Sequence, residues 1–131
     1  LKENLKLKPG NIYIAPGGCH TILRKSPLDN EFFFSYKDIP PVNNCKPSVD
    51  VFFNSLYNHI NNDILGVIMT GMGSDGLDGI KRLKEKNAYI IAQDEETSTV
   101  WGMPGSVVEA GLANEILPLE KIGERLYQLC K

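Results

Sequence analysis

The sequence lacks a long apolar run and a marked excess of either charge. No stretch approaches the roughly 18 apolar residues that a membrane span needs, and no signal-peptide pattern is present, so we expect no membrane insertion. Its 14 Lys and Arg residues against 16 Asp and Glu give a formal net charge of -2. A nucleic-acid-binding face usually shows a basic excess. The sequence therefore gives no support for nucleic-acid binding.

Cysteine is sparse, and the few present form no recognisable pattern. Cys19, Cys45 and Cys130 are widely spaced and contain no C-x-x-C pair, which favours a reducing compartment and free thiols. The two histidines, His20 and His59, have no cysteine or acid at metal-ligand spacing. We therefore expect a cytoplasmic protein without a metal ion or other cofactor.

An initiating methionine is also missing. The chain opens with Leu1, in an alternating segment that has no clear beginning of its own. The length of 131 residues suits one hydrophobic core without a second module. We therefore interpret residues 1–131 as part of one longer domain.

The first part of the chain predicts short strands. Asn11–Ala15 lies between Pro/Gly turns and predicts one strand, and Glu31–Tyr36 predicts another. The segment Thr21–Tyr36 is also compatible with a hairpin that turns at Ser26–Asn30.

From Ser48 onward the pattern predicts helices alternating with strands. Ser48 can cap a helix whose apolar stripe must face a sheet. The nearly continuous apolar run Ile64–Thr70 predicts a buried strand, the segment Leu77–Lys86 a helix, and Ala88–Gln93 a second strand. These three elements form a β-α-β unit, which should be right-handed. The apolar stripe of the first helix comprises Val49, Phe52, Phe53, Leu56 and Ile60.

The last third predicts three more elements. Pro104 is placed as the first residue of a short helix ending near Gly111. Glu115–Leu117 predicts a short strand, and a final helix carries apolar residues from Leu119 to Leu129 on one side. Strand–helix alternation of this kind is typical of a doubly wound α/β fold with a mostly parallel sheet.

A glycine-rich turn between the buried strand and its helix carries the sharpest signal. Thr70–Gly76 has the G-x-G-x-x-G spacing of dinucleotide-binding folds, and Asp94 follows about 20 residues on. Asp75, however, would place a carboxylate beside the two phosphates, a repulsion of several kcal/mol on an estimate of about 332/(εr). Asp75 fits better as a helix N-cap or as a catalytic acid at the carboxyl end of a strand. This stretch alone leaves all three alternatives open.

Five groups of residues, spread over essentially the whole chain, keep a common order and spacing. They are Pro9-Gly10 with Tyr13-Ile14-Ala15-Pro16-Gly17 and His20; Pro40-Pro41-Val42-Asn43 with Pro47-Ser48-Val49-Asp50; Gly66 to Gly76; Ala92-Gln93-Asp94; and Gly102-Met103-Pro104. Together these groups resemble the catalytic domain of the chemotaxis protein-glutamate methylesterases, the CheB family. The resemblance implies a three-layer, doubly wound α/β domain, of which this chain is the C-terminal portion.

The resemblance also implies an activity and a site. The family hydrolyses methyl esters of glutamate side chains on chemoreceptors with a Ser-His-Asp triad, and many members deamidate receptor glutamines. By carry-over Asp75 is the triad acid, and Met72 lines the active site, where a backbone amide can serve the oxyanion. The family's serine and histidine lie upstream of the region that matches Leu1, and Ser74, His20 and His59 do not replace them. We therefore expect residues 1–131 alone to be inactive.

The partners follow from the same resemblance. They are the cytoplasmic helices of methyl-accepting chemoreceptors and a receiver domain that precedes the catalytic domain in the parent protein. Two other functions remain open. One is a non-catalytic scaffold that binds a receptor or another partner, and the other, ranked last, is a dinucleotide-binding domain.

Overall fold

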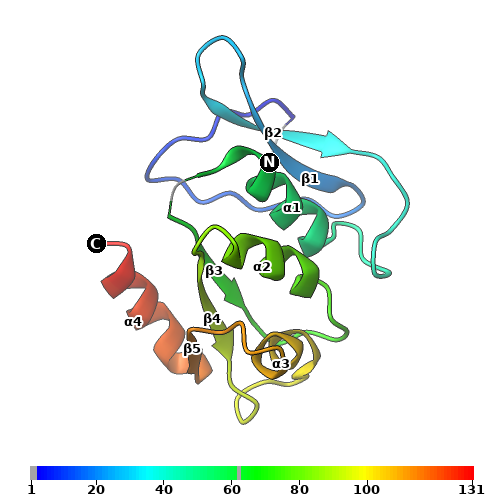
Figure 1. The fold of residues 1–131 in the computed structure, drawn as a ribbon. Coiled ribbons are helices and arrows are strands. Elements are labelled where there is room, and N and C mark those ends of the chain that lie inside the picture. The colour runs from blue at the N-terminus through cyan, green and yellow to red at the C-terminus, as the bar shows by residue number, and fades with distance from the viewer. Residues whose placement is uncertain (1–2, 62) are drawn as a thin grey trace.

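A β-hairpin and a three-stranded parallel sheet, separated by helices, make up the computed structural model, which describes residues 3–61 and 63–131 (Figure 1). The hairpin pairs β1 (His20–Lys25) with antiparallel β2 (Phe32–Lys37), and Leu23 lies opposite Phe34. The amide of Ser26 donates to the carbonyl of Glu31 at 2.8 Å and closes the turn. The hairpin and its turn are therefore as the sequence predicts.

The strand predicted at Asn11–Ala15 is wrong. Those residues form no strand, and an earlier segment of the chain bonds to the outer edge of β2. The amide of Leu7 donates to the carbonyl of Phe32 at 2.8 Å, and that of Phe34 donates to the carbonyl of Leu5 at 2.9 Å. Tyr13 instead packs its ring against Phe34, with 4.9 Å between ring centroids.

The parallel sheet has the order β3-β4-β5. Its strands are β3 (Leu65–Ile68), β4 (Tyr89–Gln93) and β5 (Glu115–Leu117), each within a few residues of its predicted range. The two ladders are parallel, with Val67 beside Ile91 and Ala92 beside Ile116. The helices are α1 (Val49–His59), α2 (Leu77–Lys84), α3 (Gly102–Glu109) and α4 (Leu119–Leu129).

Helices cover both faces of this sheet, which makes the fold doubly wound. Figure 1 shows α2 and α3 on one side of β4 and α4 on the other. The core between the sheet and helices α2 and α3 contains Ile80, Leu83, Ile90 and Val107. On the opposite side Ile122 of α4 is buried. The α/β class expected from the alternating pattern is confirmed.

The stripe of α1 packs differently from the expectation. It faces the hairpin and α2 rather than the parallel sheet. Ser55 accepts a hydrogen bond from the amide of Leu23 at 2.9 Å, while Phe53 lies against the core on the α2 side. Gly79 permits that close approach, since a Cβ there would lie 2.5 Å from the Cβ of Phe53. Helix α1 is therefore the bridge between the hairpin and the α/β layers.

The predicted start of α3 is also wrong. The helix begins at Gly102, so Pro104 is its third residue rather than its first. The amides of the first helical turn have no acceptor within their own helix, so a proline is tolerated there. The helix ends at Glu109, close to the predicted end.

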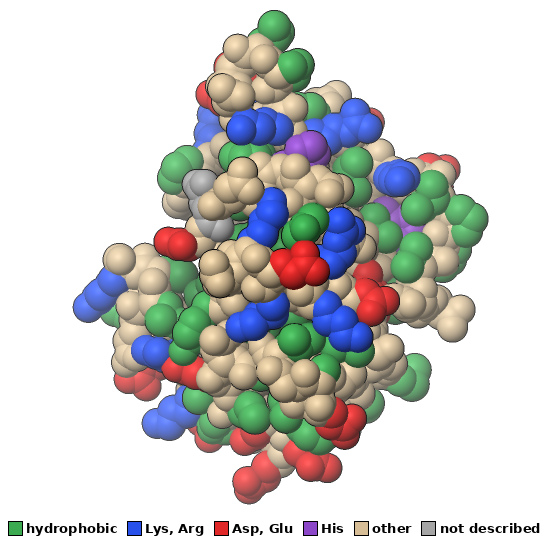
Figure 2. All heavy atoms as spheres, in the orientation of Figure 1, with side chains coloured by type: hydrophobic (Ala, Val, Ile, Leu, Met, Phe, Trp, Pro, Cys, Tyr) green, Lys and Arg blue, Asp and Glu red, His purple; other side chains and the backbone are tan. Residues whose placement is uncertain are grey.

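Strand β3 lies at one edge of the sheet. Within residues 3–61 and 63–131, no other strand pairs with its outer side. Gly66 and Ile68 are buried, whereas Leu65 and Val67 are only half-buried. Figure 2 shows basic and acidic side chains together on one face of the molecule. In this same part of the chain, no helix has the length and apolarity to cross a membrane.

Candidate functional site

Two glycine-containing turns pack together where β3 ends. Gly71 forms a parallel bridge with Trp101, and the amide of Met103 donates to the carbonyl of Gly71 at 2.8 Å. A Cβ on Gly102 would lie 2.9 Å from the Gly71 carbonyl oxygen and from Gly73 backbone atoms. The close backbone approach therefore requires glycine at this position.

Gln93, at the end of β4, ties these turns to the sheet. Its Oε1 accepts from the amide of Thr70 at 2.8 Å, and its Nε2 donates to the carbonyl of Thr97 at 2.9 Å. Its backbone carbonyl accepts from the indole N–H of Trp101 at 3.1 Å. The sequence shows Gln93 as the end of a predicted strand and as part of a family block, and neither signal reveals this organising role.

Asp75 lies at the centre of a second network, between α1 and α2. It is 3% exposed. Its Oδ1 accepts from the hydroxyl of Ser48 at 2.7 Å and the amide nitrogen of Asn43 at 3.0 Å. The backbone amides of Val49 and Asp50 donate to Oδ2 at 2.6 Å and to Oδ1 at 3.3 Å, respectively. The carboxylate thus sits on the first turn of α1.

These hydrogen bonds keep Asp75 ionised. Burial acts to raise the pKa of this carboxyl, but the side chains of Asn43 and Ser48 and the amides of Val49 and Asp50 outweigh it, and the pKa falls below its usual 3.8. Donors to the charged form favour that form. Asp75 is therefore a buried and permanently charged acid at neutral pH.

Asp50 makes the reciprocal contact. It lies in the first turn of α1 and accepts from the amide of Gly79, in the first turn of α2, at 2.7 Å. The side chain of Asn43 also donates to Asp50, at 2.9 Å, and so lies between the two carboxylates. Burial raises the pKa of Asp50, against the effect of its backbone donors. The first turn of α1 thus donates to Asp75, from the turn that precedes α2, and the first turn of α2 donates to Asp50 of α1.

The network excludes one of the sequence-based alternatives for Asp75 and argues against another. The interpretation of Asp75 as the cap of its own helix is wrong, because Gly76 occupies the N-cap position with a φ of 99°. A dinucleotide phosphate would need the amides that open α2. Asp50 already binds there, with Asp75 close by, so the site is negatively charged where an anion would have to bind.

Serine, histidine and aspartate meet in this network, but not as a catalytic triad. In a triad the histidine bonds to both the serine hydroxyl and the acid. Here the Ser48 hydroxyl bonds directly to Asp75, and the imidazole of His20 accepts from the Ser48 backbone amide at 3.1 Å through Nδ1. His20 is fully buried, and its Nε2 lies 3.1 Å from the carbonyl oxygen of Pro40. His20 is a structural residue, as its solitary position suggests.

Met72 lies on the exposed side of the turn, with 84% of its surface accessible. In the part of the chain that the structure describes, its backbone N–H has no hydrogen-bond acceptor. An amide of this kind is available to bind an oxyanion.

Cys45 is the nearest thiol to this site. Burial, followed by the neighbouring charge of Asp75, raises the pKa of this thiol. A raised pKa disfavours the nucleophilic thiolate. At neutral pH the Cys45 thiol is therefore held mainly in its protonated form.

The remaining sequence candidates lie elsewhere. Ser74 is exposed, and its carbonyl accepts from the amide of Leu77, which makes it a turn residue. His59 is the last residue of α1. Asp94 accepts from Thr97 within its own loop. Across the described ranges, no group of three His, Cys, Asp or Glu residues could hold a metal ion.

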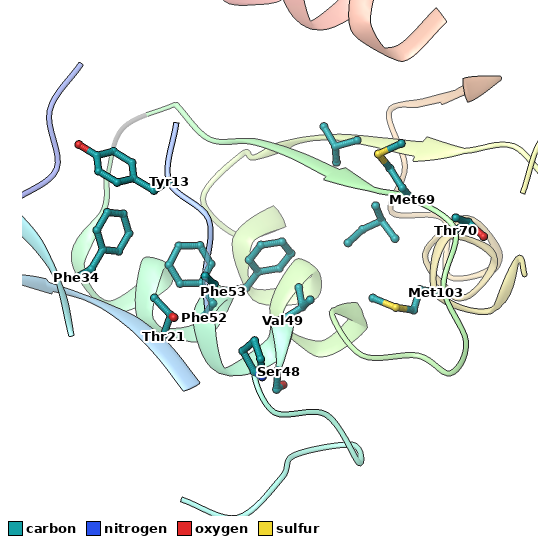
Figure 3. A pocket seen from close by; sticks show the side chains of 14 residues that line it. Tyr13, Thr21, Phe34, Ser48, Val49, Phe52, Phe53, Met69, Thr70 and Met103 are labelled. Atoms are coloured by element: carbon teal, nitrogen blue, oxygen red, sulfur yellow. The ribbon is translucent and has the colours of Figure 1, made fainter. Parts of the chain in front are cut away.

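An apolar cleft of about 650 Å³ adjoins the network (Figure 3). It extends from Tyr13 and Phe34 along α1 to Thr70 and Met103. Ser48 lines the cleft and contacts Asp75. The acid therefore lies immediately behind the wall of an open apolar cleft beside the exposed edge of β3.

Comparisons with known proteins agree on one family. Residues 1–126 match the family model described as CheB methylesterase. The chain is 46% identical to a protein-glutamate methylesterase/protein-glutamine glutaminase of Maricaulis maris, over 99% of this chain and 32% of that protein. The corresponding protein of Trichodesmium erythraeum is 41% identical, over 97% of this chain and 36% of its own length.

A solved structure gives the same result. The crystal structure of the Thermotoga maritima CheB methylesterase catalytic domain superimposes with a TM-score of 0.91 and 38% sequence identity. The match covers 98% of this chain and 67% of that one. The chain thus spans about a third of the length of the relatives named above and two thirds of the solved domain.

Proposed function

Because this chain belongs to the CheB methylesterase family, we propose that it forms the C-terminal part of a protein-glutamate methylesterase domain and supplies the acid of its Ser-His-Asp triad. Asp75 is that acid. The observation that carries the proposal is a buried carboxylate, held in its charged form at the carboxyl edge of the sheet. The serine and the histidine come from chain upstream of residues 1–131.

The reaction is acyl transfer in two steps. The serine oxygen attacks the ester carbonyl of a glutamate methyl ester while the histidine takes the serine proton. The C–O bond to the methoxy group then breaks, and the histidine returns the proton to release methanol. Water, activated by the same histidine, hydrolyses the glutamyl ester of the serine and leaves a glutamate. Asp75 holds the imidazole in the required tautomer and stabilises the imidazolium.

Met72 has a supporting role in this proposal. Both tetrahedral intermediates carry a negative oxygen, and backbone amides aimed at that oxygen stabilise it. The N–H of Met72, on the exposed side of the turn and without an acceptor among the described residues, is suited to that task. Amide substrates pass through the same intermediates, so glutamine deamidation fits the same site, with ammonia as the leaving group.

The substrate and partners follow from the family. We expect the substrate to be the cytoplasmic helices of methyl-accepting chemoreceptors, and we expect a receiver domain to precede this domain in the parent protein. Two of the relatives carry both activities in their names, methylesterase and glutaminase. A cytoplasmic location agrees with that substrate.

The test is Asp75→Asn in the full-length protein, with methanol release from methylated receptor as the assay. Asparagine keeps the size of the side chain but loses the charge, so turnover should fall about 10⁴-fold. Asp78→Asn is the matched control, because Asp78 is an exposed acid three residues away on α2, with only a 3.9 Å contact to Lys81. It should retain normal turnover.

Two outcomes would contradict the proposal. One is near-normal turnover of Asp75→Asn. The other is hydrolysis above background by residues 1–131 alone, since they lack the proposed nucleophile and base. Absence of any turnover in the full-length protein, together with receptor binding, would favour a non-catalytic scaffold.

A further inference from the structure

We propose that Ser48 and Asn43 are positioning residues for Asp75, which fix its carboxylate so that Oδ2 is the oxygen left to accept from the imidazole. This inference rests on the proposed function and names which atoms of the chain serve it.

The acceptor positions of Asp75 are used unequally. A carboxylate has about four lone-pair positions, two on each oxygen. Oδ1 receives three donors, from Ser48, Asn43 and the amide of Asp50, at 2.7, 3.0 and 3.3 Å. Among the described residues, Oδ2 accepts from the amide of Val49, at 2.6 Å, and the thiol of Cys45, a weak donor, lies near the same carboxyl group. Oδ1 is therefore saturated, and Oδ2 keeps one position for another donor.

The donors also fix the rotation of the carboxylate. Two belong to the backbone of α1 and cannot move without the helix, and its N-terminal dipole favours the negative charge. Ser48 and Asn43 add donors from outside the helical backbone, so the carboxyl plane is set by several directions at once. An imidazole that approaches Oδ2 then meets an acceptor whose orientation is already fixed.

Ser48 is itself held in place by the hairpin. Its backbone N–H donates to Nδ1 of His20, so that nitrogen carries no proton and Nε2 donates to the carbonyl of Pro40. His20 is the first residue of β1. A chain of contacts thus runs from β1 through His20 and Ser48 to the carboxylate, with no exposed member between them.

Asn43 has a further effect, because it lies between two acids. Its amide donates to both Asp75 and Asp50. Without it, the two carboxylates would face each other with less screening, and the charged form of Asp75 would be less favoured. Asn43 adopts a φ of 52°, so glycine can replace it without backbone strain.

The experiment combines a titration with kinetics. The carboxyl titration of Asp75 is followed by NMR in residues 1–131, and kcat and KM for methanol release are measured in the full-length protein. The variants are Ser48→Ala, Ser48→Thr and Asn43→Gly. Ser55→Ala is the matched control, because Ser55 is another buried serine of α1, bonded to Leu23 and Phe52 and not to Asp75.

Ser48→Ala and Asn43→Gly should each raise the pKa of Asp75 and lower kcat by about 10- to 100-fold, the usual effect of one hydrogen bond to a charged group. KM should change less than twofold. Ser48→Thr, which keeps the hydroxyl, should leave both the pKa of Asp75 and kcat as they are in the parent protein. Ser55→Ala should lower stability without changing either one.

The inference is overturned if Ser48→Ala resembles Ser55→Ala in both titration and kcat. It is also overturned if the pKa rises while kcat stays unchanged, and in that case the methylesterase assignment survives. If Asp75→Asn retains normal turnover, the assignment itself fails and the positioning role fails with it.

Discussion

The contact between α1 and α2 gives a quantitative prediction at Gly79. A Cβ there would lie 2.5 Å from the Cβ of Phe53 and 3.2 Å from Oδ1 of Asp50. Real Cβ atoms do not approach a neighbouring Cβ so closely, and the Cβ of Phe53 is attached directly to the backbone of α1, so it cannot rotate away. Gly79→Ala must therefore push the two helices apart.

The magnitude follows from two opposing effects. Replacing glycine by alanine inside a helix gains about 0.5–1 kcal/mol from chain entropy. Overpacking a tight contact costs about 1–3 kcal/mol. Separation of the helices also lengthens the 2.7 Å bond from the Gly79 amide to Asp50, and a hydrogen bond to a charged group contributes about 1.5–3 kcal/mol. We expect a net loss of about 2–4 kcal/mol in the free energy of unfolding.

Gly123→Ala is the matched control. Gly123 is an exposed residue of α4, and a Cβ there would meet nothing within 4 Å. This variant should therefore be stabilised by about 0.5–1 kcal/mol. Urea unfolding of both variants, followed by far-ultraviolet circular dichroism, measures the difference. A Gly79→Ala chain as stable as Gly123→Ala would refute the close approach of α1 and α2.

Three further predictions concern acid stability, self-association and an ion pair. Asp75 has a folded-state pKa below its usual 3.8, so its contribution to the free energy of unfolding is complete above pH 3.8 and is lost as the pH falls through the folded-state pKa. Asp75→Asn should flatten this part of the curve of stability, measured with urea, against pH. An unchanged slope would count against the prediction. The outer edge of β3, which pairs with no other described strand, should promote self-association. Val67→Lys should therefore lower the average mass measured by light scattering. A parent chain that is already monomeric would contradict the prediction. Arg125→Lys loses the paired hydrogen bonds to Glu115. Because both side chains are partly exposed, the free energy of unfolding should fall by at most about 1 kcal/mol. A loss above about 2 kcal/mol, measured by thermal unfolding, would refute that estimate.

Much of the fold can be predicted from periodicity. Alternating strands and helices from Ser48 onward identify the α/β class, because each element must bury one apolar face and its spacing reveals that face. The strand at Asn11–Ala15 was predicted from the Pro/Gly turns on either side of it and is wrong. The segment that bonds to the edge of β2 contains Leu5 and Leu7, and this tertiary contact has no local signature in the sequence. The start of α3 is misplaced because proline is tolerated at several positions of a first helical turn.

The site is less accessible to sequence reasoning. The glycine-rich turn identifies Asp75 as a special residue but leaves open which helix it serves. Its partners Ser48 and Asn43 lie 27 and 32 residues away along the chain, and no periodicity connects them to it. The blocks that contain them resemble the family, and that resemblance is the one signal that could have linked them. The pairing of Asp50 with Gly79 depends on helix packing and has no local signature.

The exchange of acids between α1 and α2 also limits how this segment can be recombined with its relatives. Asp50 precedes the turn that carries Asp75, and each acid binds the helix on the other side of β3 in the chain. A crossover point placed between residues 50 and 75 would join two halves whose acids and amides came from different parents. Chimeras with breakpoints before Asn43 or after Lys84 would inherit the whole exchange from one parent, and such breakpoints are the ones at which hybrid proteins should remain foldable.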